Sequence, residues 1–318
     1  MLLKYADDIC KDIADTELPL FWAINHTIPL IDENKIYPWR PLCCPEIFCA
    51  QWNEKQDAYL KSGQWKIIMS RNTVSLMFIP KPGKKINGIS ELHTLVDLWA
   101  WNANTAKMNS PLPDIDVMLC QIARAYYWSL MDQKNAYEQI WIIPEHIDRS
   151  AVTTPDGNMV SLIIQIGDCN TPATFQALIN HLFSPYLGWW MDVYLDDIVV
   201  YSDTFEEHVE HCKTVIDILQ HEKLHLSKKK LFFFQQELKV LGCIIDRNGI
   251  WMDPDKVASV IAWKTPTNRD LLHGFLGAVG YLADDLATVQ IPMAILHGLT
   301  EDTVPFRWEY IHQCAFED

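Results

Sequence analysis

Two patterns alternate along the chain: apolar residues at helical spacing, and short runs rich in β-branched and aromatic residues. Residues 110–132 contain both, since a helix with one apolar face leads into a strand that ends near Asp132. That apolar face consists of Ile115, Met118, Leu119 and Ile122. Further amphipathic helices are predicted at 51–65, 171–187 and 204–224, and short helices from residue 253 onwards.

Strands are predicted where apolar runs lack helical spacing. Residues 74–83 (VSLMFIPKPG) predict a strand closed by a Pro-Gly turn, and residues 92–102 (LHTLVDLWAWN) its hairpin partner. Residues 136–144 (AYEQIWIIP) and 159–167 (MVSLIIQIG) predict strands around the turn TTPDGN. The N-terminal segment contains one strand-like piece, 25–33, and is otherwise expected to be extended.

Residues 191–202 (MDVYLDDIVVYS) predict a tight hairpin, because two β-branched arms flank a Leu-Asp-Asp centre without glycine or proline. Asp196 and Asp197 at its tip repel each other, and no cation is near them in sequence. A divalent ion such as Mg²⁺, which prefers carboxylates and phosphates, would offset this repulsion. The alternative is an exposed acidic turn, which for a bare pair of aspartates is the commoner case.

The composition indicates a folded chain whose nucleic-acid site, if it has one, is local. The 318 residues are 49% hydrophobic, and the net charge of −15 argues against holding phosphates through the overall field. Two lysine clusters are local candidates, with solvated surface as the alternative for both. They are Lys81, Lys84 and Lys85, and the run Lys228, Lys229 and Lys230.

The nine scattered cysteines predict free thiols and an intracellular protein. A zinc site made of Cys43, Cys44, Cys49 and His26 is the alternative, but its spacing matches no usual finger pattern. The acidic N-terminal sequence is not a secretory signal, and no apolar run reaches 18 residues. We therefore expect a cytoplasmic or nuclear location and no membrane partner.

A set of blocks in a fixed order carries a family resemblance. The hairpin and its following helix read VYLDDIVVYSDTFEEHVEH, and the other blocks are SPLPDID, SLMDQKNAYEQI, TTPDGNMVSL, GDCNTPATFQ, KVLGCIIDRNGIWMDPDKV, LLHGFLGAVGYLADD and VPFRW. From about residue 25 to the end, the chain resembles the polymerase region of a gypsy-type LTR-retrotransposon reverse transcriptase.

The resemblance implies an α+β right-hand polymerase with fingers, palm and thumb. The palm would be an antiparallel sheet backed by helices. We expect a lead-in at 1–48, fingers at 49–106 and 138–172, palm at 107–137 and 173–251, and at 252–318 a thumb with the start of a truncated connection to an RNase H-like domain.

The resemblance also implies a reaction and a catalytic triad. The family is an RNA-directed DNA polymerase that adds dNTPs to the 3′-hydroxyl of a primer on an RNA or DNA template. Two Mg²⁺ ions, or Mn²⁺, would be held by Asp132, Asp196 and Asp197.

Further positions match family residues around the triad. Lys81, His93, Tyr137 and Ile166 fall at positions that contact the incoming dNTP, and Tyr137 would exclude a ribose 2′-hydroxyl. Relatives often carry Gln or Phe where this chain has Ile166. The primer end would be positioned by Tyr194, Leu241 and Gly242, with Lys239 able to meet a phosphate.

The chain departs from the family at several arginines. Relatives read approximately LRTVVDLRERN where this chain has LHTLVDLWAWN, so that His93, Trp99 and Trp101 stand at arginine positions. Neutral His and Trp cannot replace a bidentate cation, and residues 252–318 have four basic against ten acidic residues, a net charge of −6.

Two evolutionary explanations of these exchanges are open. Cytosine deamination could have mutated arginine codons in this gene, or the chain could come from a lineage whose residues differ at these positions. The alternative function is a degenerate, weakly active or inactive remnant that retains the fold. A nucleotide cyclase would share the palm topology but predicts a GGDEF-like turn, which this chain lacks.

Overall fold

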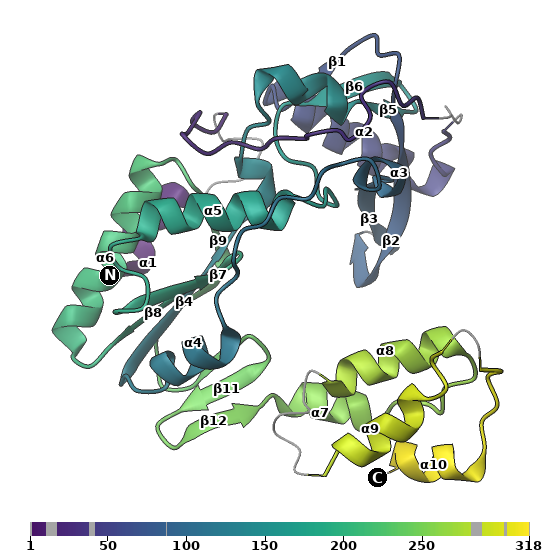
Figure 1. The fold of residues 1–318 in the computed structure, drawn as a ribbon. Helices are drawn as coiled ribbons and strands as arrows, with labels where there is room; N and C mark the ends of the chain where they lie inside the picture. The colour runs from purple at the N-terminus through teal and green to yellow at the C-terminus, as the bar shows by residue number, and fades with distance from the viewer. Residues whose placement is uncertain are drawn as a thin grey trace. The chain divides into compact units, whose positions relative to one another are not determined.

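The computed structural model describes residues 2–10, 18–37, 42–86, 88–280, 288–301 and 304–317. The chain divides into two compact units, Met1–Leu238 and Lys239–Asp318. Helices and strands both contribute substantially, which confirms the mixed α+β class (Figure 1). Within the described ranges, no helix is long and apolar enough to cross a membrane.

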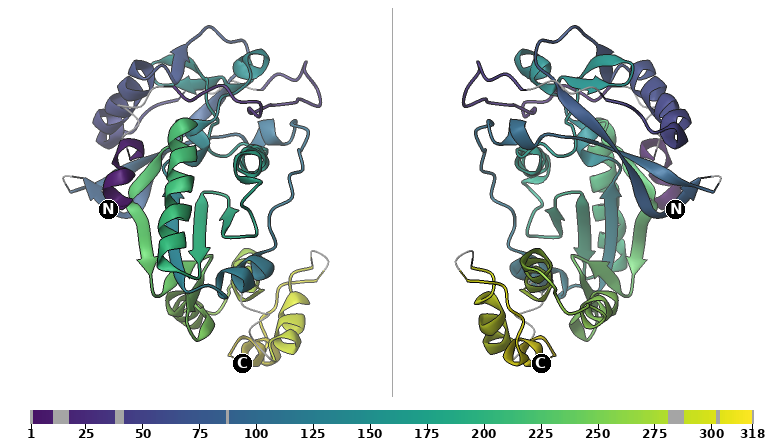
Figure 2. Two further views of the ribbon diagram at one scale, coloured as in Figure 1. Left: turned by 90° about the vertical axis from the view of Figure 1, so that its left-hand side faces the viewer. Right: turned by 90° about the vertical axis from the view of Figure 1, so that its right-hand side faces the viewer.

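The first unit contains a four-stranded antiparallel sheet in the order β7-β8-β4-β9. Two helices cover one face of this sheet, and their apolar residues form one buried cluster with those of the strands (Figures 1 and 2). The strands are β4 (Tyr127–Gln133), β7 (Met191–Tyr194), β8 (Asp197–Ser202) and β9 (Leu226–Gln235), and the helices are α5 (Thr171–Phe183) and α6 (Phe205–His221).

A five-stranded sheet in the order β1-β6-β5-β2-β3 forms the other part of the first unit. Trp52, Trp65 and Leu76 are buried in its core, where helix α2 packs. Strand β2 pairs in parallel with β5, and the other pairings are antiparallel. The elements are α2 (Glu46–Lys61), β1 (Trp65–Ile67), β2 (Val74–Ile86), β3 (Ile89–Val96), β5 (Val152–Thr154) and β6 (Gly157–Ser161).

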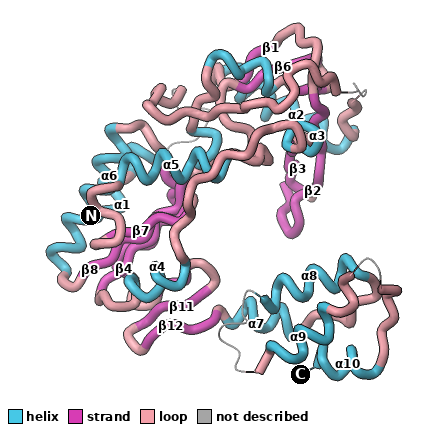
Figure 3. The backbone as a smooth tube through the Cα atoms, in the orientation of Figure 1, coloured by secondary structure: helices cyan, strands magenta, loops and turns pink. Residues whose placement is uncertain are grey.

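The long hairpin β2–β3 turns later than predicted. The Pro-Gly pair does not close it, because β2 continues to Ile86 and pairs with β3 on both sides of an irregularity between Pro80 and Lys85 (Figure 3). Proline lacks the N–H that a regular ladder needs, and Gly83 takes the left-handed φ of 71°. The pairing shifts register in this region, so β2 continues through the Pro-Gly pair instead of ending there.

One predicted strand is too long, and another is wrong. Residues 99–102 at the end of LHTLVDLWAWN form helix α3 (Trp99–Asn102). AYEQIWIIP gives the 3-10 helix η3 (Ala136–Gln139) followed by isolated bridge residues, and η4 (Pro144–Ser150) comes next. Asn135, two residues after the end of β4, has a left-handed φ of 46°, which breaks the extended backbone there.

The N-terminal segment is more structured than an extended lead-in. Apolar residues Leu2, Ala6 and Ile9 join the core of the four-stranded sheet. Residues 25–33 make isolated bridges at His26 and Leu30 in place of the predicted strand. The remaining short elements of the first unit are α1 (Leu2–Tyr5), η1 (Asp7–Ile9) and α4 (Ile115–Ile122).

The second unit combines a small sheet with the short helices that the sequence predicted from residue 253 onwards. Asp253 caps its first helix by accepting the N–H of Asp255, and Pro254 occupies the first helical turn. The block LLHGFLGAVGYLADD extends into residues 281–287, which lie outside the described residues. The elements are β10 (Leu238–Val240), β11 (Cys243–Asp246), β12 (Gly249–Met252), α7 (Pro254–Ile261), α8 (Arg269–Gly280), α9 (Gln290–His297) and α10 (Tyr310–Glu317).

Candidate active site

The three predicted catalytic aspartates lie on neighbouring parts of the four-stranded sheet. Asp132 on β4 and Asp197 on β8 are directly opposite each other in the antiparallel register. Asp196 precedes β8 in the two-residue turn that joins it to β7, and its carbonyl oxygen accepts the N–H of Gln133 at 3.0 Å. The fold therefore brings residues 64 positions apart in sequence to one end of the sheet.

The negative charge of this group is only partly balanced. Burial, and then the charges of Asp196 and Asp132, raise the pKa of Asp197 to about 6. Burial also raises the pKa of Asp132, and Lys230 opposes this rise, since its Nζ lies 2.6 Å from Oδ2 of Asp132. The positive charge of Lys230 therefore offsets only part of the negative charge of the three carboxylates.

The aspartates do not form a ready metal cage. Within the described ranges, no three His, Cys, Asp or Glu side chains meet at metal-holding distances, the predicted triad included. Asp132 is bound to Lys230. Carboxylate oxygens with unbalanced negative charge still match what Mg²⁺ requires, so the donor set fits this ion.

A buried glutamine from helix α5 fixes the acidic turn. Gln176 accepts the N–H of Leu195 at 3.1 Å, and its amide donates to the carbonyl of Val193 at 3.3 Å. Leu195 has a left-handed φ of 52°, so the turn needs such support. Sequence reasoning missed Gln176, although it is the last residue of the block GDCNTPATFQ.

His208 joins the two strands that carry Asp132 and Asp197. Its ring nitrogens lie 2.7 Å from Oγ of Ser129 on β4 and 2.9 Å from Oγ of Ser202 on β8. Burial, and then the charge of His211, lower the pKa of His208 to about 4. His208 is therefore a neutral structural residue of helix α6.

His93 and Ile166, two of the predicted nucleotide contacts, line one cavity. Gln165 borders the same cavity, and so do three residues that the sequence did not single out: Lys55, Tyr59 and Glu138. Burial, followed by the charges of Lys55 and Lys81, lowers the pKa of His93, so its ring is neutral near pH 7.

The other two predicted nucleotide contacts, Tyr137 and Lys81, do not line that cavity. Tyr137 packs edge-on against Phe175 with ring centroids 5.6 Å apart, and burial and the charge of Asp196 raise its pKa. Lys81 forms an ion pair with Glu91 across the β2–β3 hairpin, with Nζ and Oε1 3.1 Å apart. Its charge is therefore already engaged within the protein.

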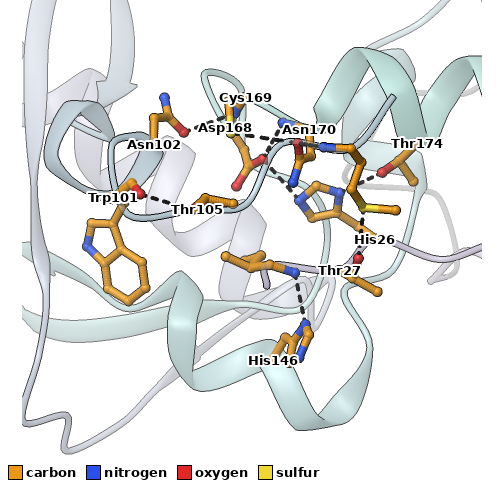
Figure 4. A network of polar contacts seen from close by, with 12 residues as sticks. His26, Thr27, Trp101, Asn102, Thr105, His146, Asp168, Cys169, Asn170 and Thr174 are labelled. Carbon is orange, nitrogen blue, oxygen red and sulfur yellow. Dashed lines mark hydrogen bonds and ion pairs between the residues drawn. The ribbon is translucent and has the colours of Figure 1, made fainter. Parts of the chain in front are cut away.

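The loop that carries Ile166 is held by a polar network (Figure 4). The Asn102 amide donates to the carbonyl of Gly167 at 2.8 Å, and its oxygen accepts the N–H of Cys169 at 3.0 Å. Nearby, His26 lies 3.0 Å from Oγ1 of Thr174 and 3.4 Å from Oδ1 of Asp168. His26 is thus part of this polar network. Asn102 holds the loop that carries Ile166, and the sequence analysis did not identify it.

The two tryptophans at arginine positions differ in their environment. Trp99 is 89% exposed, whereas Trp101 is 4% exposed and stacks on Tyr37 with ring centroids 4.8 Å apart. Trp101 is therefore a core residue of the five-stranded sheet region. Of these two tryptophans, Trp99 is the one that places its indole on the surface, at a position where the resemblance implies an arginine.

The remaining predicted contacts lie at strand ends. Tyr194 ends β7 opposite Asp197. Leu241 and Gly242 belong to the second unit and adopt left-handed φ values of 49° and 76° between β10 and β11. Lys239 is engaged by carboxylates, 2.8 Å from Asp253 and 2.9 Å from Asp255, so it is not a free phosphate contact.

The lysine run on β9 is also partly neutralised. Lys228 pairs with Asp7 at 2.6 Å, and Lys230 pairs with Asp132. Its predicted role as an open phosphate-binding patch is therefore weakened for these two residues.

Comparison with known proteins decides the family. The sequence profile described as "Reverse transcriptase (RNA-dependent DNA polymerase)" matches residues 79–245, which is more than half of the chain. The chain belongs to the reverse transcriptase family. The resemblance stated from the sequence is thereby confirmed.

Its relatives include transposon polyproteins. The chain is 27% identical over its whole length to the Transposon Tf2-3 polyprotein of Schizosaccharomyces pombe, covering 23% of that protein. It is 29% identical over 76% of its length to the Retrovirus-related Pol polyprotein from transposon opus of Drosophila melanogaster, covering 24% of it. This reverse transcriptase chain therefore spans about a quarter of the length of these relatives.

Solved structures agree on the fold. The foamy viral protease-reverse transcriptase dRH in complex with ds DNA matches with a TM-score of 0.82 at 20% identity, over 99% of this chain and 54% of that one. A second structure of the foamy viral enzyme, in complex with RNA/DNA hybrid, matches with the same TM-score over 42% of its chain.

Proposed function

We propose that this chain is the polymerase region of an RNA-directed DNA polymerase, which extends a primer by adding deoxynucleotides. The observation that supports this most is the register of the four-stranded sheet, which sets Asp132 opposite Asp197 with Asp196 in the adjoining turn. Membership of the reverse transcriptase family gives this arrangement of carboxylates a specific chemical interpretation.

The three aspartates are proposed to hold two Mg²⁺ ions, with Mn²⁺ as a substitute. Bound metal supplies Lewis-acid activation of the primer hydroxyl and charge neutralisation at the phosphates. Asp132 and Asp197 would provide the ligands from the two strands, and Gln176 would keep the turn that carries Asp196 in place. Lys230 would release Asp132 for this role.

The incoming dNTP is proposed to bind beside the cavity lined by His93 and Ile166. Tyr137 would lie under the deoxyribose, which agrees with its packing against Phe175 and with the influence of Asp196 on its pKa. Lys81 is retained as a weaker candidate, because Glu91 already pairs with it. Tyr194, Leu241 and Gly242 are proposed to position the primer end.

The substrate is proposed to be an RNA or DNA template with its primer, by analogy with the foamy viral structures that contain double-stranded DNA and RNA/DNA hybrid. We assign the five-stranded part to the fingers, the four-stranded part to the palm and the second unit mainly to the thumb. The boundaries expected from the sequence stay a proposal. Family membership also suggests action in the cytoplasm or nucleus.

The competing function is a remnant that keeps the fold but polymerises weakly or not at all. It is favoured by the neutral His93 and the exposed Trp99 at positions where relatives carry arginine. Primer extension by the purified chain on RNA and DNA templates, with Mg²⁺ and with Mn²⁺, separates the two. We expect slow, metal-dependent extension that Asp132→Asn abolishes; no extension with either metal by a folded protein would favour the remnant.

A further inference from the structure

Lys55 is a partly buried cation that forms no ion pair with any carboxylate of the described residues. It projects from helix α2, is half-buried, and its Nζ lies 2.6 Å from Oγ1 of Thr94 on β3. Its other close neighbour is the ring of Tyr59, whose centroid is 5.7 Å from Nζ. Among the ion pairs of the described residues, none involves Lys55, because no carboxylate oxygen comes within 4.0 Å of Nζ.

The nearest counter-charge is already satisfied by other groups. Glu138 accepts hydrogen bonds from the hydroxyl of Tyr59 at 2.8 Å and from the amide of Asn135 at 3.0 Å. Burial lowers the pKa of Lys55, while the more distant charge of Glu138 opposes that effect. A partly buried ammonium without a contacting anion is costly, so its retention calls for an explanation.

The position of Lys55 supplies that explanation. Lys55 lines the same cavity as His93 and Ile166, the two predicted nucleotide contacts that the fold brings together. It adjoins Thr94, the residue after His93, and its charge contributes to the lowered pKa of the His93 ring. The other cation near His93 is Lys81, and that lysine is paired with Glu91.

We propose that Lys55 binds the triphosphate of the incoming nucleotide and supplies the positive charge that relatives place at the position of His93. This inference rests on the proposed polymerase function and adds one residue to its substrate site. An ammonium is a point charge that reaches one phosphate oxygen at a time, whereas a guanidinium forms a planar fork. Lys55 would therefore replace only part of the lost contact.

The test is calorimetric binding of nucleotides to the full chain in the presence of Mg²⁺ and without primer-template, so that no turnover is needed. Lys55→Met is compared with Lys55→Arg and with the control Lys61→Met, which removes an exposed lysine from the same helix. Each protein is titrated with a deoxynucleoside triphosphate and with the matching monophosphate. We expect Lys55→Met to weaken triphosphate binding about 10- to 100-fold, Lys55→Arg to retain most of it, and Lys61→Met to match wild type.

The outcomes separate this inference from the proposed function. If wild type binds the triphosphate and Lys55→Met binds it equally well, Lys55 is not a phosphate ligand, while the polymerase proposal stands. If Lys55→Met weakens triphosphate and monophosphate to the same extent, or lowers the melting temperature far more than Lys61→Met, Lys55 is only structural. If wild type binds no triphosphate, the role of Lys55 as a phosphate ligand fails, whereas the polymerase proposal is decided separately by primer extension.

Discussion

His208 should make this protein sensitive to acid. The ring is 0% exposed and bridges Ser129 on β4 and Ser202 on β8, the strands that carry Asp132 and Asp197. Burial holds its pKa at about 4, against an ordinary value of 6.5. The unfolded chain therefore binds a proton at His208 over a pH range in which the folded chain does not.

The size and sign of the effect follow from this difference. The His208 contribution to stability is complete above pH 6.5 and is lost progressively as the pH falls from there towards 4, because protons then favour the unfolded state. Each pKa unit corresponds to about 1.4 kcal/mol, so the full loss is about 3 kcal/mol. That is a large part of the total stability of an ordinary domain.

The assay is urea unfolding followed by tryptophan fluorescence at pH 7.5 and at pH 4. Wild type should lose about 3 kcal/mol more than His208→Gln over this interval, although the variant is less stable at pH 7.5 because it loses hydrogen bonds. His221→Gln is the control, since His221 is exposed on the same helix α6. Equal pH dependence in wild type and His208→Gln would refute the reasoning.

Three further predictions concern the proposed substrate site and its support. Tyr137→Ala should raise incorporation of ribonucleotides relative to deoxyribonucleotides, and an unchanged ratio in competition assays would return Tyr137 to a packing role against Phe175. His93→Arg should raise kcat/KM for dNTPs by about 10- to 100-fold, because a charge-assisted contact is worth about 1.5–3 kcal/mol; no gain in a folded variant would contradict the proposed contact. Gln176→Leu should lower stability by about 1–3 kcal/mol, since it leaves the Leu195 N–H and the Val193 carbonyl without this partner, and a melting temperature equal to wild type would count against that role.

The elements nearest the aspartates could be predicted from local sequence. Residues 191–202 form the expected hairpin, because β-branched arms leave Leu195 and Asp196 as the only turn residues. Helix α6 begins where Thr204 accepts the N–H of Glu207, a capping pattern visible in the sequence. In both cases, the deciding interactions join residues close together in the chain.

The features that the sequence did not predict depend on contacts between distant residues or on an unusual backbone conformation. The ion pair of Lys230 with Asp132 joins residues 98 positions apart, so a lysine run gave no sign of it. Trp101 could not be recognised as a core residue, because its stacking partner Tyr37 lies 64 positions earlier. AYEQIWIIP has strand-like composition, but the left-handed Asn135 turns its start into a 3-10 helix.

The central claim is that Asp132, Asp196 and Asp197 together hold the catalytic metal ions. Anomalous diffraction from crystals grown with Mn²⁺, a primer-template and a dNTP tests it most directly. We predict an anomalous peak bound by carboxylate oxygens of Asp132 and Asp197 beside Asp196, with Lys230 displaced from Asp132. A structure with primer-template and dNTP bound, in which Lys230 still pairs with Asp132 and no peak lies at the three aspartates, would contradict the account.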